Sequence, residues 1–157
     1  MELSIDYLAN HPELVPELEA WIYDEWGRKE ADNSIENITA RLQKRMQRDR
    51  APLTLVGFLD DKPVASASIK IHEMETHPQY KYWLGAVYII PSLRGQGFGS
   101  QIVHHTVSIA AELDLKEIFL YTHSHEGFYA KLGWRTIERP IYRGRTVALM
   151  SKSPFAT

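Results

Sequence analysis

The feature that most constrains this chain is an apolar segment at residues 83–90, followed directly by a glycine-rich turn. The segment is rich in aromatic and β-branched residues, which is typical of a buried strand, and Pro91 ends it because proline has no N–H for a sheet ladder. Glycines occupy positions 95, 97 and 99, and apolar residues then recur at helical spacing over residues 100–113. The sequence therefore predicts a strand, a glycine loop (residues 94–99) and a helix in direct succession.

A glycine loop that opens a helix is suited to binding a phosphate group. Glycines at alternate positions adopt positive φ and leave their N–H groups uncovered, and the first helical turn adds unpaired N–H donors and the positive end of the dipole. Arg94 adds a permanent positive charge at the edge of the loop. The pattern favours a phosphate or pyrophosphate site over the alternative, a turn that binds no ligand.

Two common phosphate-binding motifs do not fit the glycine loop. A kinase-like P-loop requires Gly-Lys-Ser or Gly-Lys-Thr, but Gly99 is followed by serine and glutamine. A dinucleotide-binding fingerprint requires the spacing G-x-G-x-x-G in the first turn of a repeating βαβ array, whereas this loop has G-x-G-x-G and lies past the middle of the chain.

Two segments resemble the GNAT superfamily (GCN5-related N-acetyltransferases). Residues 94–99, Arg-Gly-Gln-Gly-Phe-Gly, match its acetyl-CoA signature Q/R-x-x-G-x-G/A, and residues 128–134, Phe-Tyr-Ala-Lys-Leu-Gly-Trp, match its F-Y-x-k-x-G-[FYW] segment. Within the superfamily the chain is similar to a bacterial subgroup and distantly to the actin N-terminal acetyltransferase. Because the two motifs occur in the right order and spacing, together they are far more specific than either one alone.

The resemblance implies an α/β (α+β) architecture of the GNAT type and acetyl-CoA as co-substrate. We expect a mixed, mostly antiparallel, twisted sheet of about seven strands with about four helices, splayed between its two central parallel strands. Free N–H groups on residues 88–90 would bind the pantetheine arm, and the glycine loop would bind the pyrophosphate. The residues expected to bind the co-substrate are Tyr88, Ile89, Ile90, Arg94, Gly95, Gln96, Gly97, Phe98, Gly99, Ser100, Ser124 and Tyr129.

The resemblance also implies direct acetyl transfer to a primary amine of a small molecule or a peptide. Tyr129 matches the family's tyrosine that protonates the departing sulfur; the alternative is a tyrosine that only packs under the cofactor. Glu73 and His123 are the leading candidates for the general base. Further base candidates are Glu75, His72, His77 and His125. The family commonly has an asparagine after the strand near Tyr121, where this chain has threonine, histidine and serine, so one cofactor hydrogen bond is in doubt.

The composition excludes several other functions. The 157-residue chain contains no cysteine, which excludes a thiolate nucleophile and a zinc–thiolate site, and a net charge of −2 argues against binding to nucleic acid or to a membrane surface. Neither the adjacent histidines at 104–105 nor the segment 123–126 has a recognisable metal-ligand spacing, so we expect no metal. We expect one N-acetyltransferase domain over residues 1–157, located in the cytoplasm, and the resemblance leaves a homodimer open.

The periodicities predict the remaining elements. Strands are expected at residues 3–8, 52–59, 63–71, 117–122, 134–138 and 145–151, and a first helix is expected to follow residues 11–14 and to end near residue 25. Asn33 or Ser34 would cap a second helix that runs to about residue 48, with Ile35, Ile38, Leu42 and Met46 on one face. A short helix is expected at residues 126–132, ended by Gly133. The basic run at residues 41–50 is interpreted as the solvated face and dipole-matched end of the second helix.

The acceptor side of the site is less specified by the sequence. In GNAT folds the first two helices and their link shape the acceptor pocket, so Trp26, Asp32 and Asn33 are candidates to line it, with helix caps and core edge as the alternative interpretation. An alternative function is a non-catalytic module that binds or senses acyl-CoA, although an intact Tyr129 weighs against it.

Overall fold

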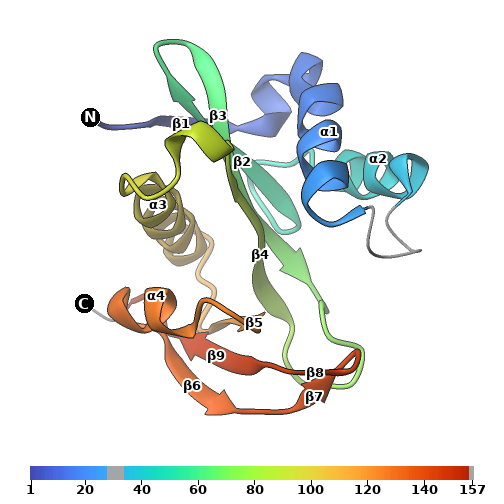
Figure 1. Cartoon of the computed structure of the whole chain (residues 1–157), viewed down its shortest axis with the longest axis vertical. Helices are drawn as coiled ribbons and strands as arrows, with labels where there is room; N and C mark the ends of the chain where they lie inside the picture. The colour runs from blue at the N-terminus through green and yellow to red at the C-terminus, as the bar shows by residue number, and fades with distance from the viewer. Residues whose placement is uncertain (28–33, 156–157) are drawn as a thin grey trace.

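The computed structural model describes residues 1–27 and 34–155, and its strands form one large mixed sheet and a small hairpin (Figure 1). The large sheet has seven strands in the order β1-β2-β3-β4-β5-β9-β6. Its strands are β1 (Ser4–Tyr7), β2 (Leu53–Leu59), β3 (Lys62–Ile71), β4 (Tyr82–Ile89), β5 (Ile118–Thr122), β6 (Arg135–Glu138) and β9 (Ala148–Lys152). Only β4 and β5 pair in parallel in this sheet, which confirms the predicted architecture.

The described helices agree with the predicted ones, with shifted ends. They are α1 (Val15–Glu25), α2 (Ile35–Lys44), α3 (Phe98–Glu112) and α4 (Glu126–Lys131), with 3-10 turns at Leu8–Asn10, Pro12–Leu14 and Pro91–Leu93. Ser34 caps α2, since its hydroxyl accepts a hydrogen bond from the Asn37 N–H at 3.2 Å, and Asn33 lies outside the described residues. None of the described helices combines the length and the apolar character that a bilayer span requires.

Helices cover the two faces of the sheet unequally. α3 packs on one face through Ile102, Val103 and Val107, and α4 adds Phe128 on the same side. α1 and α2 cover the other face over the N-terminal strands, with their buried side chains packed around Val56 (Figure 1). On that second face, the part of the sheet that α1 and α2 do not cover therefore lies beyond α2, toward the C-terminal strands.

Two sequence predictions about these elements are wrong. The expected strand at residues 145–151 is two strands: β8 (Arg145–Thr146) pairs with β7 (Ile141–Tyr142) in the hairpin, and β9 enters the large sheet between β5 and β6. The predicted strand is interrupted at Val147, because this residue is buried in a cluster with Trp83 and Tyr142. In α2, Ile35 is exposed, although Ile38 and Leu42 are buried as expected.

Candidate active site

The glycine loop has the backbone geometry of an anion-binding turn. Gly95 and Gly97 have φ values of 76° and 90°, and a Cβ atom at either position would meet nothing within 4 Å, so their N–H groups are open to a ligand. Gly97 is the N-cap of α3, and the first intrahelical hydrogen bond runs from the Gln101 N–H to the Gly97 carbonyl. The N–H groups of residues 98–100 therefore precede the helical ladder and are oriented as anion donors.

Gly99 differs from the other two glycines. It does not have positive φ, which the sequence analysis expected of all three; it lies in the first turn of α3. A Cβ atom there would lie 3.4 Å from Cζ of Phe128. The absence of a side chain thus brings α4, which carries Phe128 and Tyr129, against the start of α3.

Arg94 contacts both the end of β4 and the end of α1. Its Nε donates a hydrogen bond to the Ile89 carbonyl at 2.8 Å, and one terminal nitrogen lies 3.3 Å from a Glu25 carboxylate oxygen. The guanidinium also lies 5.3 Å from the centroid of the Tyr88 ring, and Trp21 and Trp26 pack against that ring. Part of the Arg94 charge is therefore already paired, and its role toward a phosphate stays a prediction.

The two central parallel strands separate at a bulge in β4. β4 and β5 are in register only at Trp83 and Phe119. Toward β3, Ser68 faces Gly85 and Ser66 faces Tyr88, so three steps along β4 oppose two along β3. Ala86, inside this bulge, has a φ of 51°. The bulge therefore turns the C-terminal end of β4 away from β5 and opens a space between the strands.

The expectation that residues 88–90 all have free N–H groups is wrong for Ile90. The Ile90 N–H donates to the Val64 carbonyl at 2.9 Å. Because N–H groups of an antiparallel strand point alternately to its two sides, the Tyr88 N–H also points toward β3, and the Ile89 N–H points toward the gap beside β5. Ile89 is thus the residue of the three whose N–H is available to a pantetheine arm.

Tyr129 lies in α4 next to the start of α3. Its ring packs edge-on against Phe128 and Trp134, and burial raises the pKa of the Tyr129 phenol to about 12. The hydroxyl makes no hydrogen bond to another residue in the described part of the chain. A protonated phenol without a protein partner is available to donate to a ligand.

The candidates for the general base lie in different surroundings. Glu73 follows the end of β3, with a carboxylate oxygen 3.1 Å from Nζ of Lys70. His123 is exposed just after β5. Near it the Thr122 hydroxyl accepts a hydrogen bond from the His125 N–H at 3.0 Å, and the Ser124 hydroxyl bonds Nδ1 of His125 at 2.9 Å. Ser124, expected to bind the cofactor, is therefore engaged within its own turn.

Glu75 and His77 have structural partners. The Tyr142 hydroxyl donates to a Glu75 carboxylate oxygen at 2.6 Å, and this hydrogen bond lowers the pKa of Glu75. His77 is buried and bonds Glu138 at 3.1 Å and the Thr76 hydroxyl at 2.8 Å. His72 adopts a turn conformation with a φ of 54° and lines a pocket together with Glu73. Of the acceptor-pocket candidates, Trp26 lies against Tyr88, and Asp32 and Asn33 lie outside the described residues.

The basic side chains around Glu73 were not among the predicted site residues. Arg45 is 8% exposed and therefore does not belong to a solvated helix face, as was expected of the run at residues 41–50. Lys70 lies beside Glu73 with its side chain 19% exposed. The available signal was Lys70 itself, a lysine that directly follows the continuous buried run at residues 64–69 of β3 and precedes its last residue, Ile71.

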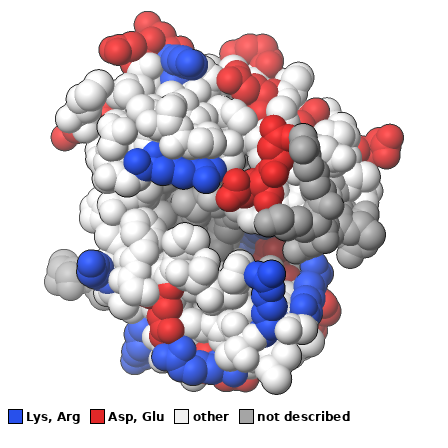
Figure 2. Space-filling view, in the orientation of Figure 1, with Lys and Arg blue, Asp and Glu red and all other residues white. Residues whose placement is uncertain are grey.

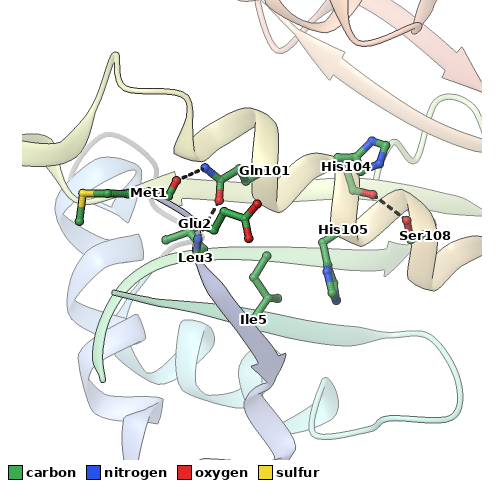
Figure 3. A pocket seen from close by; sticks show the side chains of 8 residues that line it. All are labelled: Met1, Glu2, Leu3, Ile5, Gln101, His104, His105 and Ser108. Atoms are coloured by element: carbon green, nitrogen blue, oxygen red, sulfur yellow. Dashed lines mark hydrogen bonds between the residues drawn. The ribbon is translucent and has the colours of Figure 1, made fainter. Parts of the chain in front are cut away.

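A separate pocket lies between the N-terminal segment and α3 (Figure 3). The Gln101 side chain joins the two, donating to the Met1 carbonyl at 3.0 Å and accepting from the Leu3 N–H at 2.7 Å. The side chains of His104 and His105 point in different directions there. No group of three or more potential metal ligands occurs among the residues that the structure describes.

Comparisons with known proteins agree with this geometry. The model of the acetyltransferase (GNAT) family matches residues 11–134. An aminoglycoside 6'-N-acetyltransferase complexed with coenzyme A is 16% identical with a TM-score of 0.75, covering 98% of each chain. The ribosomal-protein-alanine N-acetyltransferase of Brucella melitensis is 19% identical with a TM-score of 0.71, covering 96% of this chain and 99% of that chain. Naa50 of Arabidopsis thaliana, in complex with the bisubstrate analogue CoA-Ac-MVNAL, is 16% identical with a TM-score of 0.66, covering 98% of this chain and 99% of that chain.

The structural similarities establish the fold, and the family match extends over most of the chain, including both motifs. The open amides of the glycine loop, the splayed strands and the Tyr129 phenol belong to the segments predicted to bind the co-substrate, and that assignment stays a prediction. This chain therefore belongs to the GNAT family of acetyltransferases, whose co-substrate is acetyl-CoA.

Proposed function

We propose that the protein transfers the acetyl group of acetyl-CoA directly to a primary amine of a small molecule or a peptide. The observation that carries the proposal is the separation of β4 from β5, with the glycine loop following β4 and α4 packed at Gly99 through Phe128, the neighbour of Tyr129. Both acceptor classes have precedents among the structural neighbours, which include an aminoglycoside acetyltransferase and a ribosomal-protein-alanine acetyltransferase. The absence of cysteine supports direct transfer, because an acyl-cysteine intermediate is excluded.

In the proposed reaction the amine nitrogen attacks the thioester carbonyl carbon, and the carbon–sulfur bond breaks. Negative charge develops on the carbonyl oxygen, and the Ile89 N–H, which points into the gap, is the proposed donor to it. The sulfur departs as a thiolate and takes the proton of the Tyr129 hydroxyl. The raised pKa of Tyr129 supports this role, since the phenol stays protonated at neutral pH.

The amine must lose a proton before or during the attack. Glu73 and His123 remain the proposed bases, directly or through water. The Glu73 carboxylate is already engaged in an ion pair with Lys70, which makes it less available to accept a proton from the amine. His123 has no such partner among the described residues, so we rank it first.

The test is acetyl-CoA turnover by the purified protein with a panel of primary amines. Release of the coenzyme A thiol that depends on both the protein and an amine supports the proposal. Tight binding of acetyl-CoA by calorimetry, with thiol release at background for every amine, would instead favour the non-catalytic sensor. Absence of acetyl-CoA binding at millimolar concentration would contradict both functions.

A further inference from the structure

A pocket rich in basic side chains opens between α2, the end of β3 and the β7–β8 turn. Its volume is about 310 Å³. We call it the basic pocket; it is lined by Arg41, Lys44, Arg45, Pro52, Lys70, Ile71, His72, Glu73 and Arg143. Basic side chains also gather below the hollow in the middle of the face seen in Figure 2, over the end of the molecule where the hairpin lies. The pocket is thus bordered by α2 on one side and by the end of β3 and the hairpin on the other.

Two basic side chains of the pocket, Arg45 and Lys70, are largely buried, and both interact with the carboxylate of Glu73. Arg45 is 8% exposed, and the side chain of Lys70 is 19% exposed. Burial lowers the pKa of Arg45 to about 10 and also lowers the pKa of Lys70, while Glu73 opposes both shifts. The Arg45 guanidinium makes no hydrogen bond to another residue within 1–27 or 34–155. Among the described residues, Trp134 Nε1 is the side-chain nitrogen that is fully buried without a partner, so the Arg45 nitrogens are not sealed from solvent. They are open to the pocket, where an anion can pair with them.

The charges that line the pocket are strongly unbalanced. Five cationic side chains and one carboxylate are among the described lining residues, and Glu75 nearby also interacts with Arg143. With Glu75 counted, three formal positive charges remain in excess. The negative end of the α2 dipole offsets only about half a charge. The whole chain has a net charge of −2, so the excess is a local feature and not a consequence of composition. Such a concentration of positive charge attracts anions.

The basic pocket adjoins the gap between β4 and β5. A Cβ atom at Gly85 would lie 2.9 Å from Cδ and Cε of Lys70 and 3.2 Å from its Nζ. The Lys70 side chain therefore lies over β4 at Gly85, in the space that a larger residue would fill. The next residue, Ala86, is the one with positive φ in the bulge. The Lys70 ammonium is therefore beside the point where the strands begin to separate.

The β7–β8 hairpin contributes Arg143 from a firmly anchored position. Tyr142 is 5% exposed, packs edge-on against Tyr121, and donates its hydroxyl hydrogen to Glu75 at 2.6 Å. This anchoring keeps the turn against the loop that follows β3. The neighbouring Arg145 belongs to the same hairpin but does not line the pocket.

We propose that the basic pocket binds an anionic group, a carboxylate or a phosphate, carried by the amine acceptor. This inference rests on the proposed acetyl transfer and narrows its substrate class. An anion held by Lys70, Arg45 and Arg143 would leave the amine of the same molecule free to reach the thioester at the bulge. A polycationic acceptor is disfavoured, because the pocket would repel it.

The first experiment compares acceptors that differ only in the anion. Rates are measured with β-alanine against β-alaninamide and with phosphoethanolamine against ethanolamine. We expect the anionic member of at least one pair to have a kcat/KM about tenfold or more higher, with most of the difference in KM. The pair that shows the preference identifies carboxylate or phosphate as the recognised group. Equal kcat/KM within both pairs, or a preference for the neutral members, would overturn the inference and leave the proposed acetyl transfer intact.

Two matched substitutions in the β7–β8 hairpin test whether the basic pocket causes the preference for anionic acceptors. Arg143→Gln should raise the KM of the anionic acceptor about tenfold and leave that of the neutral acceptor unchanged. Arg145→Gln removes the same charge two residues away and should change neither value. Both positions are exposed, so both variants are expected to fold. Equal effects of the two substitutions would show a general charge effect and would contradict a specific site.

A binding measurement separates this inference from the proposed enzyme. Titration of inorganic phosphate into the wild-type protein, followed by NMR shifts of backbone amides, should perturb residues around Lys70 and Glu73, and Arg143→Gln should weaken that binding. Phosphate binding at these residues without acetylation of any amine would overturn both the proposed transfer and the acceptor role of the pocket, and would leave an anion site of another purpose. No perturbation around Lys70 and Glu73, with acetylation intact, would overturn the pocket alone.

Discussion

The glycine loop and the basic pocket both favour anions, but they are made from different parts of the chain. The loop is one continuous segment between β4 and α3, and its donors are backbone N–H groups exposed by Gly95 and Gly97. The pocket takes its charges from α2, the end of β3 and the β7–β8 turn, which are distant in sequence, and its donors are side chains. The loop therefore depends on backbone conformation, whereas the pocket depends on charge and on how the elements pack.

Because their donors differ, the glycine loop and the basic pocket should be disrupted by different kinds of substitution. A change that blocks the backbone amides should weaken acetyl-CoA binding and leave acceptor recognition intact. A change to the pocket's charges should raise the KM of the acceptor and leave acetyl-CoA binding intact. The proton donor Tyr129 lies on the loop side, in α4, but should affect the chemical step alone.

The largest expected effect is on that chemical step. Tyr129→Phe should lower kcat by about 10²- to 10⁴-fold, because the thiolate loses its proton donor, while the Kd for acetyl-CoA stays unchanged. Steady-state kinetics and calorimetry measure the two quantities. An unchanged kcat would remove the acid role, and a much weaker acetyl-CoA affinity would mean that the ring only packs under the cofactor.

The next largest effect is on the loop. Gly97→Val places a side chain at a φ of 90° and over the open amides, and should raise the Kd for acetyl-CoA by about 30- to 150-fold, corresponding to about 2–3 kcal/mol. Gly144→Val is the matched control, since Gly144 has a φ of 80° and equally open surroundings in the β7–β8 turn. It should cost similar backbone strain but leave the Kd unchanged. Similar Kd values for both variants would show that the loop does not bind acetyl-CoA.

A smaller effect is expected where the pocket meets β4. Gly85→Ala should displace the Lys70 side chain and raise the KM of an anionic acceptor by about fivefold at constant acetyl-CoA affinity. Gly57→Ala serves as control, because a Cβ atom there would be as crowded, 3.0 Å from Leu3, but lies on β2 away from the pocket. If both variants raise the acceptor KM equally, the effect comes from strain in the sheet and not from Lys70.

The smallest expected effect is on the alkaline side of the pH profile. Because burial raises the pKa of Tyr129 to about 12, its proton is retained from about pH 8 to about pH 10, where an ordinary phenol begins to ionise. The kcat at saturating substrates should therefore not fall over that range through loss of this proton. A fall with an apparent pKa of about 10 that disappears in Tyr129→Phe would contradict a buried, protonated donor.

Much of the loop side was predictable because its information is local. Pro91, the spaced glycines and the apolar stripe after them act within one strand, turn and helix, and the structure has α3 starting at Phe98 close to the expected residue. The bulge was implied only by the family resemblance. Nothing in the residues themselves marks Ala86 for positive φ, because alanine carries no preference for that conformation.

The pocket side was not predictable for the opposite reason. Arg45 falls in a basic run that reads as a solvated helix end, and its burial follows from where α2 packs against the sheet. The expected strand at residues 145–151 included β8, and β7 was not predicted; the hairpin forms where Val147 and Tyr142 enter a cluster with Trp83. Such contacts join residues that are far apart along the chain, so they cannot be predicted from the spacing of apolar residues.

The strand–loop–helix unit, the family resemblance and the candidate proton donor follow from the amino-acid order alone, because backbone freedom at glycine and short-range apolar spacing act between neighbours along the chain. Three features required the folded chain: the Ile90 N–H is used within the sheet, the Ile89 N–H points into the gap, and basic side chains of α2, β3 and the hairpin line one pocket with Glu73. Those outcomes depend on strand register and on burial, which arise only when distant segments pack together.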